Sequence, residues 1–85
     1  MARTMTNRDT VIETLCRLAA ERAEAEGTLV TLETHLFNEL NFDSLDASEY
    51  IMNIEDEFDV SIPDEQAEKV KTIGQAVDML MPLLR

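Results

Sequence analysis

The feature that most restricts the fold of this chain is a stretch that begins at Asp43 and contains neither Gly nor Pro before Pro63. A second carboxylate, Asp46, follows Asp43 at the three-residue spacing of an N-terminal capping box. The pattern predicts a helix over Ser44–Phe58. Its inward stripe, spaced by three and four residues, consists of Ala47, Tyr50, Ile51, Ile54 and Phe58.

The opposite side of this helix mixes two large apolar side chains, Leu45 and Met52, with carboxylates. Helical spacing places the following residues in one outward sector: Leu45, Asp46, Glu49, Met52, Asn53 and Asp56. Exposed apolar groups among carboxylates suit a docking surface, because the charges steer a basic partner and the apolar groups supply the desolvated contact.

One further helix is expected before this one and a short one directly after it. Thr6, three residues before Asp9, predicts the start of a first helix, whose apolar periodicity continues until Gly27 offers a stop. Pro63 lacks an N–H and therefore suits the first turn of a short helix that continues through about Glu68.

A last helix is predicted after the capping signature of Thr72 and Gln75. Its apolar stripe consists of Ile73, Ala76, Val77, Leu80 and Leu83 or Leu84. Residues 28–41 lack periodicity but are rich in apolar side chains, so we expect a long loop packed onto the helices, with room for one short helical turn. The fold class is therefore all-α, a small four-helix bundle of three longer helices and one short one, in a single domain over residues 1–85.

The charge balance restricts the partners. Seven Lys and Arg against eighteen Asp and Glu give a net charge of −11, so the field of the protein repels nucleic-acid phosphates and anionic lipid headgroups. Fourteen of the carboxylates lie between Arg22 and Lys69, where no Lys or Arg occurs. We expect basic proteins as partners, with no nucleic acid and no membrane.

The single cysteine and the lack of a recognisable targeting signal predict a cytoplasmic protein. Cys16 is the only cysteine, so no internal disulfide can form. The sequence does not show the positively charged start and following apolar run that are typical of a signal peptide. The longest purely apolar run, near residues 79–81, is far too short to span a bilayer.

Catalytic and metal-binding residues are sparse. His35 is the only histidine, and neither His35 nor Cys16 has a partner at catalytic or metal-ligand spacing. No stretch has the alternating oxygen ligands and turn glycine of a Ca²⁺ loop. We therefore expect no enzyme and no metal site, with His35 as a surface or packing residue and Cys16 as a buried thiol.

Ser44 is the candidate functional residue, because it stands where the loop meets the predicted helix and its hydroxyl should be exposed. A serine at a helix start ordinarily serves as the cap, but here Asp43 can already fill that role. The N–H groups at a helix N-terminus favour an attached phosphate. A phosphodiester on Ser44 is therefore the sharper hypothesis, and capping is the plainer one.

The residues around Ser44 resemble the modification motif and recognition helix of acyl carrier proteins. The similarity lies in the run from Asp43 to Asp46, in Glu49 and Met52, and in the acidic run 55–59. It extends through Ile62, Pro63 and residues 64–69, and the loop at 36–40 and the helix at 72–80 also match. The first helix matches in pattern only.

This resemblance implies a carrier whose Ser44 receives 4′-phosphopantetheine from coenzyme A through a phosphopantetheinyl transferase. The arm would hold acyl chains as thioesters and present them to synthase, reductase and dehydratase enzymes of fatty-acid or of specialised lipid or polyketide biosynthesis. The carrier would be a monomer, with a channel for the acyl chain along its second helix. The implied residues that dock on basic patches of these enzymes are Asp43, Leu45, Asp46, Glu49, Met52, Glu55 and Asp56.

Four positions depart from the usual pattern of the family. Asn41 and Phe42 stand where Gly and a small residue often precede the motif, which adds a bulky ring beside the attachment point. Ser48 replaces an apolar residue one turn after the modified serine. Tyr50 stands where an aliphatic residue is preferred, and it would reshape the acyl channel or pass its hydroxyl to the rim. These changes leave open whether the pathway is general fatty-acid synthesis or a specialised one.

Two other interpretations fit part of the sequence. A carrier of aminoacyl, aryl or peptidyl groups would keep the fold and the modified serine, but such carriers usually have a less acidic second helix. An unmodified acidic interaction module would bind a basic partner through the same helix, with Ser44 merely at the helix start, and would use every feature except the motif.

Overall fold

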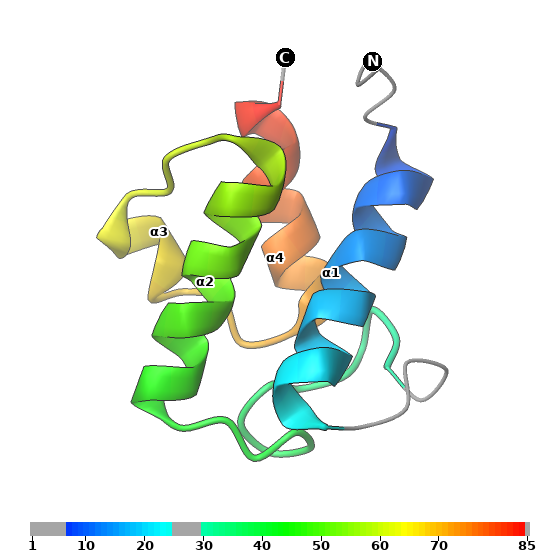
Figure 1. Cartoon of the computed structure of the whole chain (residues 1–85), viewed down its shortest axis with the longest axis vertical. Helices are drawn as coiled ribbons and strands as arrows, with labels where there is room; N and C mark the ends of the chain where they lie inside the picture. Colours follow the sequence, from blue (N-terminus) through cyan, green and yellow to red (C-terminus); the bar gives the residue numbers. More distant parts are fainter. Residues whose placement is uncertain (1–6, 25–29, 85) are drawn as a thin grey trace.

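The computed structural model describes residues 7–24 and 30–84, and these residues form four α-helices and one 3₁₀ turn (Figure 1). The elements are α1 (Arg8–Ala23), α2 (Ser44–Phe58), α3 (Asp64–Ala67), α4 (Ile73–Leu80) and η2 (Met81–Leu83). Helices α1, α2 and α4 stand side by side, and the short α3 lies beside α2 (Figure 1). The predicted all-α four-helix bundle is confirmed.

Helix α1 differs from the sequence prediction at both ends. Asn7 is its cap, because the side chain of Asn7 accepts a hydrogen bond from the Thr10 N–H at 2.8 Å. The predicted start at Thr6, which lies outside the described residues, is therefore wrong by one position. The helix ends at Ala23 and Glu24 adopts a left-handed conformation with φ of 59°. The helix therefore ends before the stop that Gly27 was expected to provide.

Helix α2 has the predicted bounds and the predicted cap. The Asp43 carboxylate accepts a hydrogen bond from the Asp46 N–H at 2.9 Å, and the Asp46 carboxylate accepts one from the Asp43 N–H at 3.2 Å. On the inward stripe, Tyr50 and Ile54 are fully buried. The other three residues of that stripe, Ala47, Ile51 and Phe58, are partly buried.

Tyr50 joins α2 to α1 inside the core. Its hydroxyl donates a hydrogen bond to the Leu15 carbonyl at 2.9 Å, and burial raises the pKa of Tyr50. The expectation that this hydroxyl reaches the rim is wrong, because a backbone carbonyl of α1 offers it a buried partner. The ring of Phe42 meets the Tyr50 ring edge-on, with 5.8 Å between centroids, and is itself buried. Phe42 therefore packs into the core rather than beside the candidate attachment point.

The loop before α2 is tied to the segment that begins α4. The Leu36 N–H donates to the Lys71 carbonyl at 2.8 Å, and the Gly74 N–H donates to the Leu32 carbonyl at 2.8 Å. A Cβ at Gly74 would lie 3.2 Å from that Leu32 oxygen, so this close approach favours glycine. From residue 30 to residue 42 the loop packs onto the helices as predicted, and it contains one helical turn, in which the Glu39 N–H donates to the His35 carbonyl at 2.9 Å. Its buried side chains are Val30, Thr34, Leu36 and Phe42.

Helix α4 begins with the predicted capping box and ends earlier than its apolar stripe suggests. Thr72 accepts from the Gln75 N–H at 3.1 Å, and Gln75 accepts from the Thr72 N–H at 3.2 Å. The helix stops at Leu80, and the 3₁₀ turn η2 follows. Pro82 explains the change, because it has no N–H to continue the α-helical hydrogen bonds. The short helix predicted after Pro63 is α3, which spans a single turn and has Pro63 at its N-cap.

Tyr50→Phe should lower the free energy of unfolding by about 1 kcal/mol, because it keeps the ring but removes the buried hydrogen bond to Leu15. For a domain of this size, the melting temperature should fall by about 4–8 °C for each kcal/mol lost. Thermal unfolding followed by circular dichroism measures this change. Asn53→Ala, at an exposed position of the same helix, is the control, and equal melting temperatures for both variants would contradict the prediction.

Candidate functional site

Ser44 is the first residue of α2, and its side chain is exposed. The side-chain cap of this helix is Asp43, which already accepts from the Asp46 N–H. The Asp43 carbonyl accepts from the Ala47 N–H at 3.0 Å, as the first hydrogen bond of the helix requires. The Ser44 hydroxyl is therefore not needed as the cap and is accessible from solvent.

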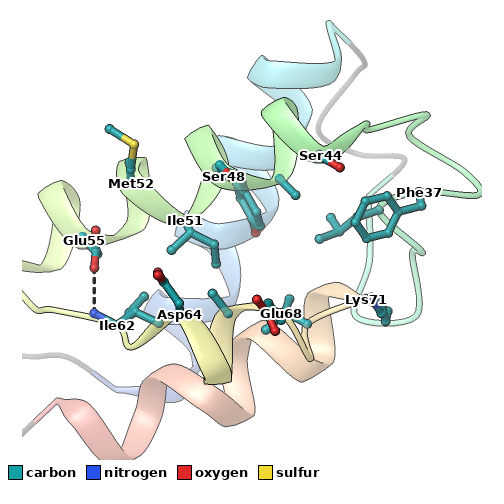
Figure 2. Close-up of a pocket in the computed structure, with 15 residues that line it drawn as sticks. Phe37, Ser44, Ser48, Ile51, Met52, Glu55, Ile62, Asp64, Glu68 and Lys71 are labelled. Atoms are coloured by element: carbon teal, nitrogen blue, oxygen red, sulfur yellow. Dashed lines mark hydrogen bonds between the residues drawn. The ribbon is translucent and has the colours of Figure 1, made fainter.

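A groove of about 760 Å³ runs from Ser44 along the space between α2 and α3 (Figure 2). Figure 2 shows Ile51 pointing from α2 into this groove, with Ile62 across from it and Phe37 beyond the Ser44 end. The apolar residues that line it are Leu36, Phe37, Ala47, Ile51, Met52, Ile62, Ala67 and Val70. Tyr50 forms part of the inner wall. Below Ser44, the molecule therefore offers an apolar space that is open to solvent.

The rim of the groove is polar and contains charges of both signs. Ser48, Asp64 and Glu68 line it together with Lys71. The Lys71 ammonium lies 5.2 Å from the centroid of the Phe37 ring, a cation–π distance. The groove thus combines an apolar lining with a polar edge.

Glu55 holds the far edge of this groove in place. Its carboxylate accepts a hydrogen bond from the Ile62 N–H at 2.7 Å (Figure 2). This bond ties α2 to the loop that leads into α3, so it sets the distance between the two walls. The sequence resemblance implies docking for Glu55, which stays a prediction, whereas the fold gives this carboxylate a partner within the chain.

The outward face of α2 carries the two apolar residues that the periodicity predicted to be exposed. Leu45 is 64% exposed and Met52 is 58% exposed, and they are the large exposed hydrophobic residues of the described chain. Asp43 and Asp56 are exposed beside them. The predicted mixture of apolar and acidic groups on this face is confirmed.

Arg22 reaches this acidic face from the last turn of α1. Its Nε lies 3.2 Å from Oδ1 of Asp46, and its Nη2 pairs with the Glu49 carboxylate. The Asp43 N–H and then the Arg22 guanidinium hold the pKa of Asp46 below its ordinary value. Sequence reasoning missed this contact because the cation comes from 24 residues earlier in the chain.

Cys16 and His35 have packing roles. Cys16 is partly buried, and this burial raises the pKa of its thiol, which disfavours the reactive thiolate. The Nδ1 atom of His35 accepts from the Asn38 N–H at 3.1 Å, inside the loop. Over residues 7–24 and 30–84, His, Cys, Asp and Glu side chains form no cluster of three suited to a metal ion. None of the helices in this described part has the length and apolar character to cross a membrane.

Comparisons with known proteins place this site in a family. Residues 13–80 match the family described as "Phosphopantetheine attachment site". The chain is 44% identical to an acyl carrier protein of Porphyromonas gingivalis over 63 residues, which cover 74% of this chain and 81% of that protein. It is 43% identical to one from Lactobacillus acidophilus, again over 63 residues, with 74% and 79% covered.

A solved structure shows the same fold. The structure of an acyl carrier protein from Enterococcus faecalis, described for the high thermal stability of that protein, superposes with a TM-score of 0.77. The sequence identity is 32%, and the superposition covers 92% of this chain and 99% of the other.

Glu55→Ala should loosen the edge of the groove. Because hydrogen bonds to charged groups contribute roughly 1.5–3 kcal/mol, the Ile62 amide should exchange with deuterium at least about tenfold faster. Amide exchange followed by NMR measures this rate, with the Ile54 amide as an internal reference. Asp56→Ala removes the same charge from the next residue and should leave the Ile62 rate nearly unchanged. Equal rates in the two variants would show that Glu55 does not hold the edge.

Proposed function

This chain belongs to the acyl carrier proteins, which carry acyl groups on phosphopantetheine, and we propose that Ser44 is the residue that bears the 4′-phosphopantetheine. One observation carries the proposal: Ser44 is exposed at the start of α2, at the end of an apolar groove, while Asp43 serves as the cap. In the attachment step, the Ser44 hydroxyl oxygen would bond to the phosphorus that carries the pantetheine of coenzyme A. The bond from that phosphorus to the bridging oxygen of the diphosphate would break, and the adenosine bisphosphate and the Ser44 proton would leave.

The local backbone favours this modification. A helix N-terminus carries a partial positive charge of roughly half an elementary charge, and α2 presents that end beside Ser44. A phosphodiester on Ser44 therefore gains electrostatic stabilisation that a site in the middle of a helix would not offer. When bound, the group supplies a terminal thiol that holds an acyl chain as a thioester.

The groove between α2 and α3 is the proposed shelter for the acyl chain. Its apolar lining begins beside Ser44 and includes Ile51 and Ile62. Each CH₂ group that leaves water for such a lining gains roughly 0.8 kcal/mol. Tyr50 lines the inner wall, and its hydroxyl is already bonded to Leu15, so Tyr50 sets the depth of the shelter without offering a polar group to the chain.

The family implies interaction with biosynthetic enzymes and with a transferase. We infer that the enzymes are a phosphopantetheinyl transferase and synthase, reductase and dehydratase enzymes, and that their basic patches dock on the outward face of α2. The exposed side chains of Leu45, Met52 and Asp56 support this inference. The carrier itself then acts as a monomer that presents its arm and catalyses no step.

The alternative interpretations have less support. An unmodified acidic module does not agree with the family match, because that family is defined by phosphopantetheine attachment. The relatives at 43–44% identity are named acyl carrier proteins, which favours acyl over aminoacyl or peptidyl cargo. Fatty-acid biosynthesis fits the family.

Incubation with coenzyme A and a promiscuous phosphopantetheinyl transferase should add one phosphopantetheinyl group to the natural chain and none to Ser44→Ala. Intact-mass spectrometry reads the result directly. Ser61→Ala, at an exposed serine that does not line the groove, is the matched control and should be modified like the natural chain. A mass gain in Ser44→Ala would move the attachment site elsewhere. No gain in any variant that circular dichroism shows to be folded would overturn the proposed function.

Asp56→Lys should slow transfer to partner enzymes, because it places a positive charge at an exposed position of the docking face. We expect the KM for the carrier to rise about three- to tenfold at low ionic strength, and raised salt to weaken docking of the natural chain. Steady-state transferase kinetics measure both effects. Glu13→Lys makes the same charge change at an exposed position of α1 and should raise the KM less. Equal effects in both variants would argue against docking at α2.

A further inference from the structure

Two carboxylates of the outward face of α2 are occupied within the chain. Arg22 pairs with Asp46 and with Glu49, and the three side chains are 26%, 32% and 40% exposed. Asp56 is exposed, and over residues 7–24 and 30–84 it has no ion-pair partner. The face is therefore divided into a part that is paired within the chain and a part that is open.

The packing of α1 on α2 puts Arg22 where it is. The two helices run in opposite directions side by side (Figure 1), and Tyr50 bonds to the Leu15 carbonyl at their contact. Arg22 lies seven residues, or about two turns, beyond Leu15 on the same face of α1. That step leads toward the start of α2, where Asp46 lies one turn before Tyr50. The packing of the two helices therefore brings the Arg22 side chain beside Asp46.

Arg17 is a useful contrast on the same helix. Its side chain is 52% exposed, and it pairs with Glu21 at 3.4 Å and with Glu57 at 3.6 Å. Neither of these carboxylates lies in the outward sector of Leu45 and Met52. Arg22, at half that exposure, is the arginine that covers docking carboxylates.

We propose that Arg22 is a specificity-determining residue of the docking face, because it occupies Asp46 and Glu49 in the free carrier. The inference rests on the proposed docking of basic enzymes at α2. A partner whose basic groups reach Asp56, with an apolar contact on Leu45 and Met52, docks without disturbing any internal pair. A partner that requires Glu49 must first displace the Arg22 guanidinium, so its binding is weakened.

The contacts of Arg22 support this discrimination between partners. One guanidinium spans both carboxylates, with Nε on Asp46 and Nη2 on Glu49, so a partner lysine that approaches Glu49 competes with a group that is held at two points. Removal of Arg22 would free two carboxylates beside the exposed apolar pair. The face would then attract basic partners more strongly and discriminate less between them.

Arg22→Gln should lower the KM of the unmodified carrier in the phosphopantetheinyl transferase reaction by about three- to tenfold at low salt, with kcat unchanged. The transferase with coenzyme A is the probe. Arg17→Gln removes the same charge from the same helix and should change the KM by less than about twofold. Arg22→Lys, which keeps the charge but not the fork, should give an intermediate KM. An unchanged or raised KM for Arg22→Gln, or equal effects at both arginines, would overturn the proposal.

A second measurement separates occupation of Glu49 from a general change of charge. Glu49→Gln should raise the KM at least about threefold more in the Arg22→Gln background than in the natural chain, where Arg22 already occupies this carboxylate. Asp56→Asn should raise the KM by the same factor in both backgrounds. Equal effects of Glu49→Gln in the two backgrounds would contradict occupation by Arg22. A chain that gains no mass in any variant would instead refute the carrier function itself, so the two failures are distinguishable.

Discussion

The hydrogen bond from the Tyr50 hydroxyl to the Leu15 carbonyl fixes how α1 and α2 lie against each other. A buried hydroxyl without a partner would cost free energy, so this bond favours the observed packing of the two helices over shifted ones. That packing turns the start of α2, with Ser44, toward solvent and places the last turn of α1 beside Asp46. The accessible serine and the paired acidic face therefore have a common origin in the core.

Helix α2 serves two surfaces at once because its period brings different residues to each. Ile51 and Ala47 line the groove toward α3, whereas Leu45 and Asp56 face away from it. Met52 stands where the two surfaces meet, since it is exposed and also lines the groove. An enzyme that docks on the outward face would therefore lie close to the groove that we propose for the acyl chain. This proximity suits a carrier, because docking of an enzyme and release of the acyl chain would then involve neighbouring side chains.

Local features of this fold could be predicted from the sequence, whereas contacts between distant residues could not. The bounds of α2, its Asp43–Asp46 capping box and the exposure of Leu45 and Met52 follow from spacing within one helix. The role of Glu55 depends on a backbone N–H seven residues away, and the position of Arg22 depends on the packing of two helices. The cap of α1 moved from Thr6 to Asn7 because neighbouring residues can compete for one cap, and periodicity does not rank them. Ser44 was singled out because Asp43 can already serve as the cap, and the resemblance of the surrounding residues to a modification motif led to the attachment hypothesis, which stays a prediction.

Helix α1 supplies the arginines of the ion pairs in the described part of the chain. Arg8 pairs with Asp78 on α4, Arg17 with Glu57 on α2, and Arg22 with two carboxylates of α2. A chain with a net charge of −11 is weakened by its own repulsion, and each of these pairs relieves it where two helices meet. The number of such pairs on α2 has a limit in the proposed function, because a fully neutralised α2 would not steer the basic enzymes that we propose as partners. Asp56 at the open end and Glu49 at the paired end of the same face show how one helix can meet both demands.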